Sequence, residues 1–157
     1  MDISLKFHGP YTFTDSPMSV FSCGYAKSEG IYLWTVRQSG TQHHLIHYVG
    51  ETIGLAKRQR EHLTAILGLN YGIWDPEKAR NGVSELIWKG AWRIKDGSGP
   101  GQQIETYGKL DRKIVLEYVA SMGIFFAKLA EDRNTRMHVE GCIGWNLRNW
   151  HPEYKIL

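Results

Sequence analysis

The chain has 157 residues and a formal net charge of +3 at pH 7, with 19 lysines and arginines against 16 aspartates and glutamates. This length suits one domain with its own core, and the small positive charge is compatible with an anionic partner. No apolar stretch approaches membrane-spanning length and the two cysteines are far apart without a Cys-x-x-Cys pair, so we expect a soluble cytoplasmic protein with reduced thiols.

A strand hairpin and a helix are predicted in the first half of the chain. Residues 1–28 contain Gly-Pro and Ser-Pro turn signals and fit a short strand or an extended lead-in. Residues 31–36 and 45–49 are runs of β-forming residues, with Ser39 and Gly40 at the turn of a long hairpin. Thr52 can cap a following helix, which Gly68 would end.

The second half is predicted to contain two helices on either side of a buried strand. The pattern is weak between residues 70 and 108, which look like loops around a short amphipathic piece at 84–92. Beyond it we expect a helix at 111–121, a strand at 123–129 and a last helix at 135–150. These elements indicate an α+β domain.

Arg58 and His62 are the first residues that point to chemistry. They are four positions apart in the predicted helix, so they lie on nearly one face, about 6 Å apart along the axis. A guanidinium matches a pair of phosphodiester oxygens, and an imidazole can donate to a phosphate or shuttle a proton. The alternative is a solvated basic helix face with a partly buried histidine.

Three elements together resemble the motifs of the GIY-YIG nuclease superfamily. They are GIY at 30–32, YVG at 48–50 and LAKRQREH at 55–62. In that family the first two lie on adjacent antiparallel strands, an arginine follows the second glycine by eight residues, and many members carry a histidine four residues later. Arg58 and His62 match both spacings. The two tripeptides are separated by residues 33–47, a few more than is usual in the family, which a hairpin loop can absorb.

The resemblance implies a fold and a domain arrangement. We expect a small antiparallel three-stranded sheet flanked by helices, in a single domain over residues 1–157. The resemblance covers about residues 30–68 and 123–152, so residues 69–122 would be an insertion specific to a subgroup.

A metal ligand is also implied, because the family holds one divalent cation with a glutamate on a later helix. Glu140 is our candidate, and Mg²⁺ or Mn²⁺, one per active site, is the expected cofactor, since such ions prefer hard oxygen ligands and keep several waters. Glu117 is the competitor, although it fits better as an exposed polar residue of a core helix. Glu140 could also simply pair with Arg136 one helical turn earlier.

The implied activity is metal-dependent hydrolysis of DNA by an endonuclease, with a restriction-like role. Tyr32 is the expected base, and Tyr48 would orient the water or bond the phosphate. Arg58 would stabilise charge on the phosphate oxygens, and His62 would hold the phosphate or relay a proton. Double-strand cleavage would require a homodimer or two sequential nicks.

Two departures keep other functions open. The family's asparagine beyond the glutamate is not found at its usual distance, because Asn146 and Asn149 come too early. This favours, as the alternative, a weakly active or inactive DNA-binding module. His43, His44 and His47 are the only residues that suggest a small-molecule enzyme or a zinc site, but His44 would point opposite to the other two on an extended segment.

Basic residues of the predicted helix and of the 69–122 segment are candidates for DNA contacts, with a solvated surface as the alternative. They are Lys57, Arg60, Lys78, Arg80, Lys89 and Arg93. Several tryptophans could stack on bases, although their spacing is more typical of a core stripe.

Overall fold

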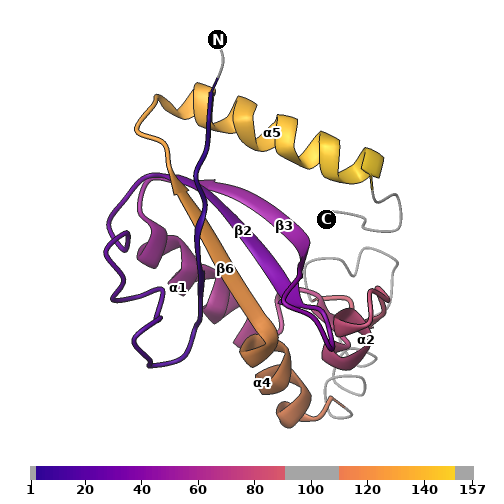
Figure 1. Ribbon diagram of the computed structural model, residues 1–157. Helices are drawn as coiled ribbons and strands as arrows, with labels where there is room; N and C mark the ends of the chain where they lie inside the picture. The colour runs from indigo at the N-terminus through magenta and orange to yellow at the C-terminus, as the bar shows by residue number, and fades with distance from the viewer. Residues whose placement is uncertain (1–2, 91–109, 151–157) are drawn as a thin grey trace, which may run out of the picture.

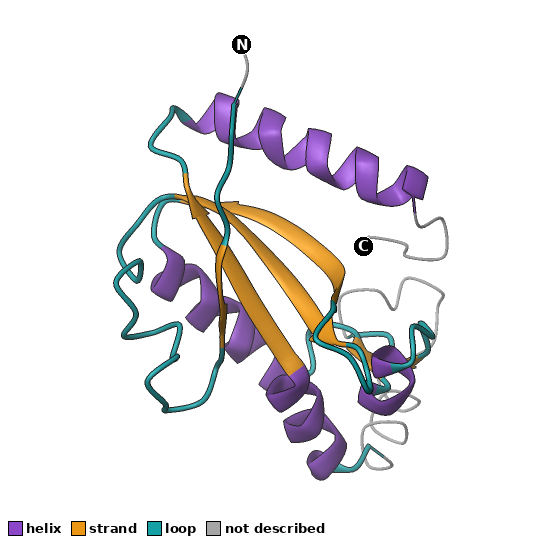
Figure 2. Ribbon diagram, in the orientation of Figure 1, coloured by secondary structure: helices purple, strands orange, loops and turns teal. Residues whose placement is uncertain are grey.

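The computed structural model describes residues 3–90 and 110–150, which form a mixed α+β fold (Figures 1 and 2). This confirms the predicted α+β class. An antiparallel sheet has the order β1-β6-β2-β3, and a two-stranded sheet pairs β4 with β5. The strands are β1 (His8–Tyr11), β2 (Gly30–Arg37), β3 (His44–Thr52), β4 (Ile73–Trp74), β5 (Leu86–Trp88) and β6 (Met122–Lys128).

The described helices lie on both faces of the larger sheet. They are α1 (Leu55–Leu67), α2 (Pro76–Arg80), α4 (Arg112–Ser121) and α5 (Arg133–Trp150). Helices α1 and α4 cover one face, whereas α5 crosses the other (Figure 1). None of these described helices is long and apolar enough to cross a membrane.

The hairpin, the strand at 122–128 and the helices α1, α4 and α5 agree with the sequence predictions to within a few residues. The start of α1 differs from the prediction. The N-cap residue is Gly54, and the predicted cap, Thr52, lies two residues before it. The Thr52 hydroxyl accepts a hydrogen bond from the Gly54 amide at 3.0 Å and so shapes the turn that leads into the helix. Gly68 ends α1 as predicted.

The larger sheet has four strands, whereas the resemblance predicts three. The additional strand, β1, pairs antiparallel with β6 at the edge of the sheet. Its sequence, HGPY, contains the Gly-Pro pair that resembles a turn signal. Proline is tolerated there because an edge strand needs hydrogen bonds on only one side, and the register of β1 is irregular around it.

Two hydrophobic cores lie on opposite faces of the sheet. Alternate residues of β2 divide between them, because successive strand side chains point to opposite faces. Tyr32 and Trp34 belong to the larger core, with residues of α1 and α4. Ile31 and Leu33 belong to the smaller core, against which Val139 and Ile143 of α5 pack. The run Gly30–Val36 is therefore fully buried.

Close packing explains the glycine of each strand motif. A Cβ atom on Gly50 would lie 2.3 Å from the hydroxyl oxygen of Tyr32, which is its cross-strand neighbour. A Cβ on Gly30 would lie 2.1 Å from the carbonyl oxygen of Ala127 on β6, and Gly30 also has a positive φ of 159°. Both positions exclude any side chain, so the glycines have a structural reason independent of function.

The segment between α1 and β6 contributes to the core. Val115, Tyr118 and Val119 of α4 are buried in the larger core, and the Trp88 indole donates to the Leu69 carbonyl at 2.7 Å. The predicted amphipathic piece at 84–92 contains the short strand β5, and its last two residues lie outside the described part. Whether 69–122 is an insertion within a family remains a prediction.

Candidate active site

Tyr32 and His62 form a buried pair at the centre of the larger core. The Tyr32 hydroxyl and the Nε2 atom of His62 are 2.7 Å apart, and neither side chain is more than 2 % exposed. Tyr32 is the third residue of β2, and His62 lies on α1. The packing of α1 is fixed by a second buried contact, in which the Trp34 indole donates to Gln59 Oε1 at 2.8 Å.

Burial keeps both members of this pair neutral. Desolvation raises the pKa of Tyr32 far above its usual value, Tyr48 adds to this, and Arg58 partly offsets it. Desolvation, followed by repulsion from Arg58, lowers the pKa of His62 to about 3. The Nδ1 atom of His62 is buried and has no hydrogen-bond partner among the described residues, which further disfavours the doubly protonated ring.

This shift predicts a loss of stability in acid. Unfolded His62 takes up a proton below its ordinary pKa of 6.5, whereas folded His62 does so only near pH 3, so stability falls as the pH drops through this window. At pH 5 the loss is about 2 kcal/mol relative to pH 7.5. His47, with a pKa lowered to about 4 by burial, adds to it. Chemical denaturation at both pH values measures the total.

The control for this effect is His62→Gln, which retains a hydrogen-bonding group near Tyr32 but does not titrate. We expect its stability to fall less between pH 7.5 and pH 5, by about 2 kcal/mol, than that of the wild type. An identical acid loss in both proteins would contradict the assignment to His62.

Tyr48 and Arg58 lie beside this pair, nearer the surface. The ring centroid of Tyr48 is 5.9 Å from those of Tyr32 and His62. Burial raises the pKa of Tyr48, Tyr32 opposes this, the Glu140 carboxylate raises it and Arg58 lowers it. Arg58 pairs with Glu61 at 3.1 Å, but both side chains are about half exposed, so this bond is weak and a phosphate could replace it.

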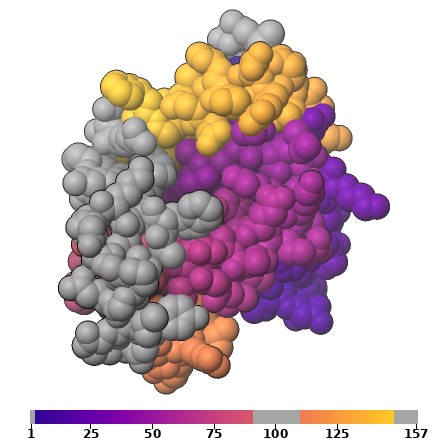
Figure 3. Space-filling model, turned by 180° about the vertical axis from the view of Figure 1, so that it is seen from behind, coloured from indigo at the N-terminus to yellow at the C-terminus, as the bar shows by residue number. Residues whose placement is uncertain are grey.

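Glu140 lies near Tyr48 and Arg58, although its helix, α5, packs on the opposite face of the sheet. Strand β3 is one of the two edge strands of the sheet, opposite β1, and its surface lies between α5 and α1 when the molecule is seen from behind (Figure 3). Burial raises the pKa of Glu140, the Glu51 carboxylate raises it further, and the Glu51 backbone amide and Arg58 lower it. Glu140 is thus close to residues of both β3 and α1. The candidate site spans the edge of β3.

Glu51 was not recognised in the sequence, although it directly follows the YVG tripeptide. It is 17 % exposed and is paired with Arg136 at 3.2 Å and with Arg133 at 3.6 Å. Arg136 is 3 % exposed and also pairs with Glu29 at 2.8 Å. Arg136 therefore pairs with these two carboxylates, and the predicted alternative of a pair between Arg136 and Glu140 is not found.

A third tyrosine, Tyr71, also lies at this site, with its ring centroid 5.7 Å from that of His62. It follows α1 in a loop that carries no motif, so nothing in the sequence marks it. Glu117, the competitor for the metal role, is exposed on α4 and pairs with Lys113 at 3.7 Å. Asn146 is exposed on α5.

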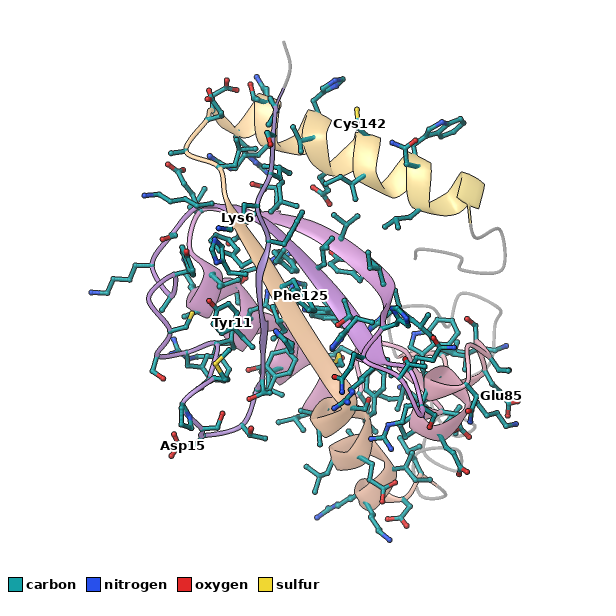
Figure 4. The ribbon with its side chains drawn as sticks, viewed as in Figure 1. Lys6, Tyr11, Asp15, Glu85, Phe125 and Cys142 are labelled. Carbon is teal, nitrogen blue, oxygen red and sulfur yellow. The ribbon has the colours of Figure 1, made fainter. Side chains whose placement is uncertain are left out.

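The predicted DNA-contact residues are spread over the surface. Lys57 and Arg60 are exposed on α1, and the Arg60 guanidinium lies 5.7 Å from the ring centroid of Phe21. Lys78 and Arg80 are exposed on α2, and Lys78 pairs with Glu85, which is labelled in Figure 4. The other two are Lys89, which is exposed after β5, and Arg93, which lies outside the described residues.

The histidines at 43, 44 and 47 do not converge. His44 bonds the Thr35 hydroxyl at 2.9 Å, whereas His47 contacts the Trp34 ring on the other face. In residues 3–90 and 110–150 no group of three or more histidines, cysteines or acidic residues is placed to hold a metal. Both cysteines are free, and Cys142 points away from the sheet on the outer side of α5 (Figure 4).

Comparisons with protein-family models, with curated proteins and with solved structures find no significant match. The function is therefore inferred from the site itself.

Proposed function

We propose that the protein is a divalent-metal-dependent DNA endonuclease of the GIY-YIG type. The observation that supports this best is the convergence at one strand edge of a phenol pair, a guanidinium, a neutral imidazole and a carboxylate. Tyr32, Tyr48, Arg58 and His62 come from β2, β3 and α1, and Glu140 comes from α5. If His62 were only a core residue and Arg58 only a solvated one, neither would need the Glu140 carboxylate from the opposite layer beside it.

The carboxylate fits a divalent cation held mainly by water. Glu140 is partly buried, is repelled by Glu51, and has no ion-pair partner among the described residues. A cation would relieve this repulsion, and Mg²⁺ commonly binds through one or two carboxylates and keeps its remaining waters. Glu140 would hold the ion, which when bound supplies positive charge beside the phosphate and the departing 3′ oxygen.

The other residues have separate tasks. Arg58 exchanges its weak pair with Glu61 for the non-bridging phosphate oxygens and stabilises the charge that develops there. Tyr48 orients the phosphate or the attacking water. As the water oxygen bonds to phosphorus, its proton passes to the Tyr32 oxygen while the Tyr32 proton passes to the neutral Nε2 of His62. The bond to the 3′ oxygen breaks, and that oxygen takes a proton from solvent.

This relay avoids a free phenolate. The raised pKa of Tyr32 makes its ionised form costly. A concerted transfer to the neutral imidazole of His62 avoids the phenolate but forms an imidazolium, which burial disfavours because it lowers the pKa of His62 to about 3. Tyr32 has no exposed surface, so the structure must open enough to admit one water to its hydroxyl when the substrate binds. The negative charge of the bound phosphate favours the imidazolium that results.

Plasmid cleavage in the presence of Mg²⁺ or Mn²⁺ tests this proposal. We expect cleavage to stop in excess chelator and to resume when the ion is restored. Glu140→Gln should weaken Mn²⁺ binding at least tenfold in calorimetry and abolish turnover, whereas the matched variant Glu117→Gln should retain both. Undiminished cleavage in chelator would exclude the metal role.

The alternative is a protein that grips DNA without cutting it, for which the misplaced asparagine is the motivating observation. The same experiment separates the two functions. A purified protein that shifts DNA but leaves plasmid intact at every metal concentration would be the binding module.

A further inference from the structure

A second basic site lies at the far end of the β2–β3 hairpin. Here Arg37, the last residue of β2, the loop at 38–43, Arg80 of α2 and the end of α4 surround an open hollow of about 750 Å³. The Ser39 amide donates to the Arg80 carbonyl at 2.9 Å, which ties the hairpin loop to α2. The hollow is therefore built from three elements that contact one another.

The lining of this hollow is suited to an anion. Arg37, His43 and Arg80 are exposed in it, and no carboxylate is among its lining residues. Arg37 uses Nε to bond the Thr41 carbonyl at 3.1 Å, and neither arginine forms an ion pair with a described residue. The neighbouring Lys78, in contrast, is paired with Glu85. Two unpaired guanidiniums and an imidazole beside one hollow favour a phosphate group.

The spacing to the candidate active site matches a DNA backbone. Tyr32 and Arg37 are five residues apart on β2, which is about 17 Å at the rise of an extended strand. The same length corresponds to about five base pairs of duplex. A duplex that lies along the edge strand β3 would thus reach the catalytic groups and the hollow together.

We propose that this hollow is a second phosphate-binding site, in which Arg37 and Arg80 hold the backbone of the same DNA duplex about five base pairs from the cleaved bond. This inference rests on the proposed function for its substrate. It adds a positioning contact at a distance from the chemistry, contributed by the hairpin loop that is longer than is usual in the resembled family.

The test is the salt dependence of DNA binding, measured by fluorescence anisotropy in chelator with one duplex several helical turns long. Each lost phosphate contact should lower the slope of log Kd against log salt by about 0.9, so Arg37→Gln/Arg80→Gln should lose about 1.8. Arg37→Lys should retain most of the slope that Arg37 contributes, because lysine keeps the positive charge. Arg112→Gln, which makes the charge change of one of these two substitutions at the other end of α4, should leave the slope unchanged.

The outcomes separate this inference from the proposed function. An unchanged slope in the double variant, or an equal fall in Arg112→Gln, would overturn the second site even if the protein cuts DNA. A lower slope in the double variant of a protein that never cuts DNA would support the site and reject the nuclease. A wild-type protein that does not bind the duplex would overturn both.

Discussion

Replacing Arg136 with methionine should lower the free energy of unfolding by about 3 kcal/mol, the lower end of the range for breaking a buried ion pair. Arg136 is 3 % exposed and bonds two carboxylates, so its loss leaves Glu51, in a partly buried position beside Glu140, with only its longer pair to the exposed Arg133. Glu29 is 40 % exposed and can be solvated instead, which limits the loss. Urea denaturation at neutral pH, with the midpoint and slope both fitted, measures the change.

Arg133→Met is the matched control, because Arg133 also pairs with Glu51 but is 72 % exposed. Its effect should stay within about 0.5 kcal/mol, as for most surface ion pairs. Adding Glu51→Gln to Arg136→Met should recover part of the lost stability, since it removes a partly buried charge that keeps only its weak pair with Arg133. Equal losses in the two arginine variants would mean that burial of the Arg136 network does not set its strength.

The sequence predicts those parts of the fold that depend on local periodicity. The hairpin, α1, α4, β6 and α5 each have a clear pattern of apolar residues in the sequence. Strand β1 was harder to identify because its Gly-Pro pair resembles a turn, and only its pairing with β6 at a sheet edge makes proline acceptable. A single sequence contains no signal for that pairing.

In the candidate site, too, local patterns predict some residues, whereas others depend on tertiary packing. Arg58 and His62 are linked by helical spacing and Tyr32 by its strand, and these residues do lie together. Glu51, Arg136 and Tyr71 could not be placed, because their positions depend on how α5 and the loop after α1 pack against the edge of β3. The sequence also gives no measure of burial, which neutralises His62 and leaves Tyr32 without exposed surface.

That burial changes what is expected of the two tyrosines when each loses its hydroxyl. In a solvent-facing cleft, loss of either tyrosine hydroxyl would leave stability close to that of the wild type, because water could take its place. In the structure Tyr32→Phe leaves His62 without its 2.7 Å bond in a dry core, which should cost about 1 to 3 kcal/mol. Tyr48 is only partly buried, and water can replace the hydrogen bond between its hydroxyl and Tyr32, so Tyr48→Phe should stay within about 1 kcal/mol of wild-type stability.

For activity the larger effect should again be that of Tyr32→Phe, because a phenyl ring can neither accept the water proton nor pass one to His62. Single-turnover cleavage should fall by about 10⁴-fold, at the upper end for a lost general base, whereas Tyr48→Phe should lose about 10²-fold, as for one lost hydrogen-bond donor. If Tyr32 and His62 act as one unit, Tyr32→Phe/His62→Gln should be no slower than Tyr32→Phe alone. If the losses of rate from the two substitutions multiply in the double variant, Tyr32 and His62 act independently. A fast Tyr32→Phe beside an inactive Tyr48→Phe would mean that the roles of the two tyrosines are exchanged.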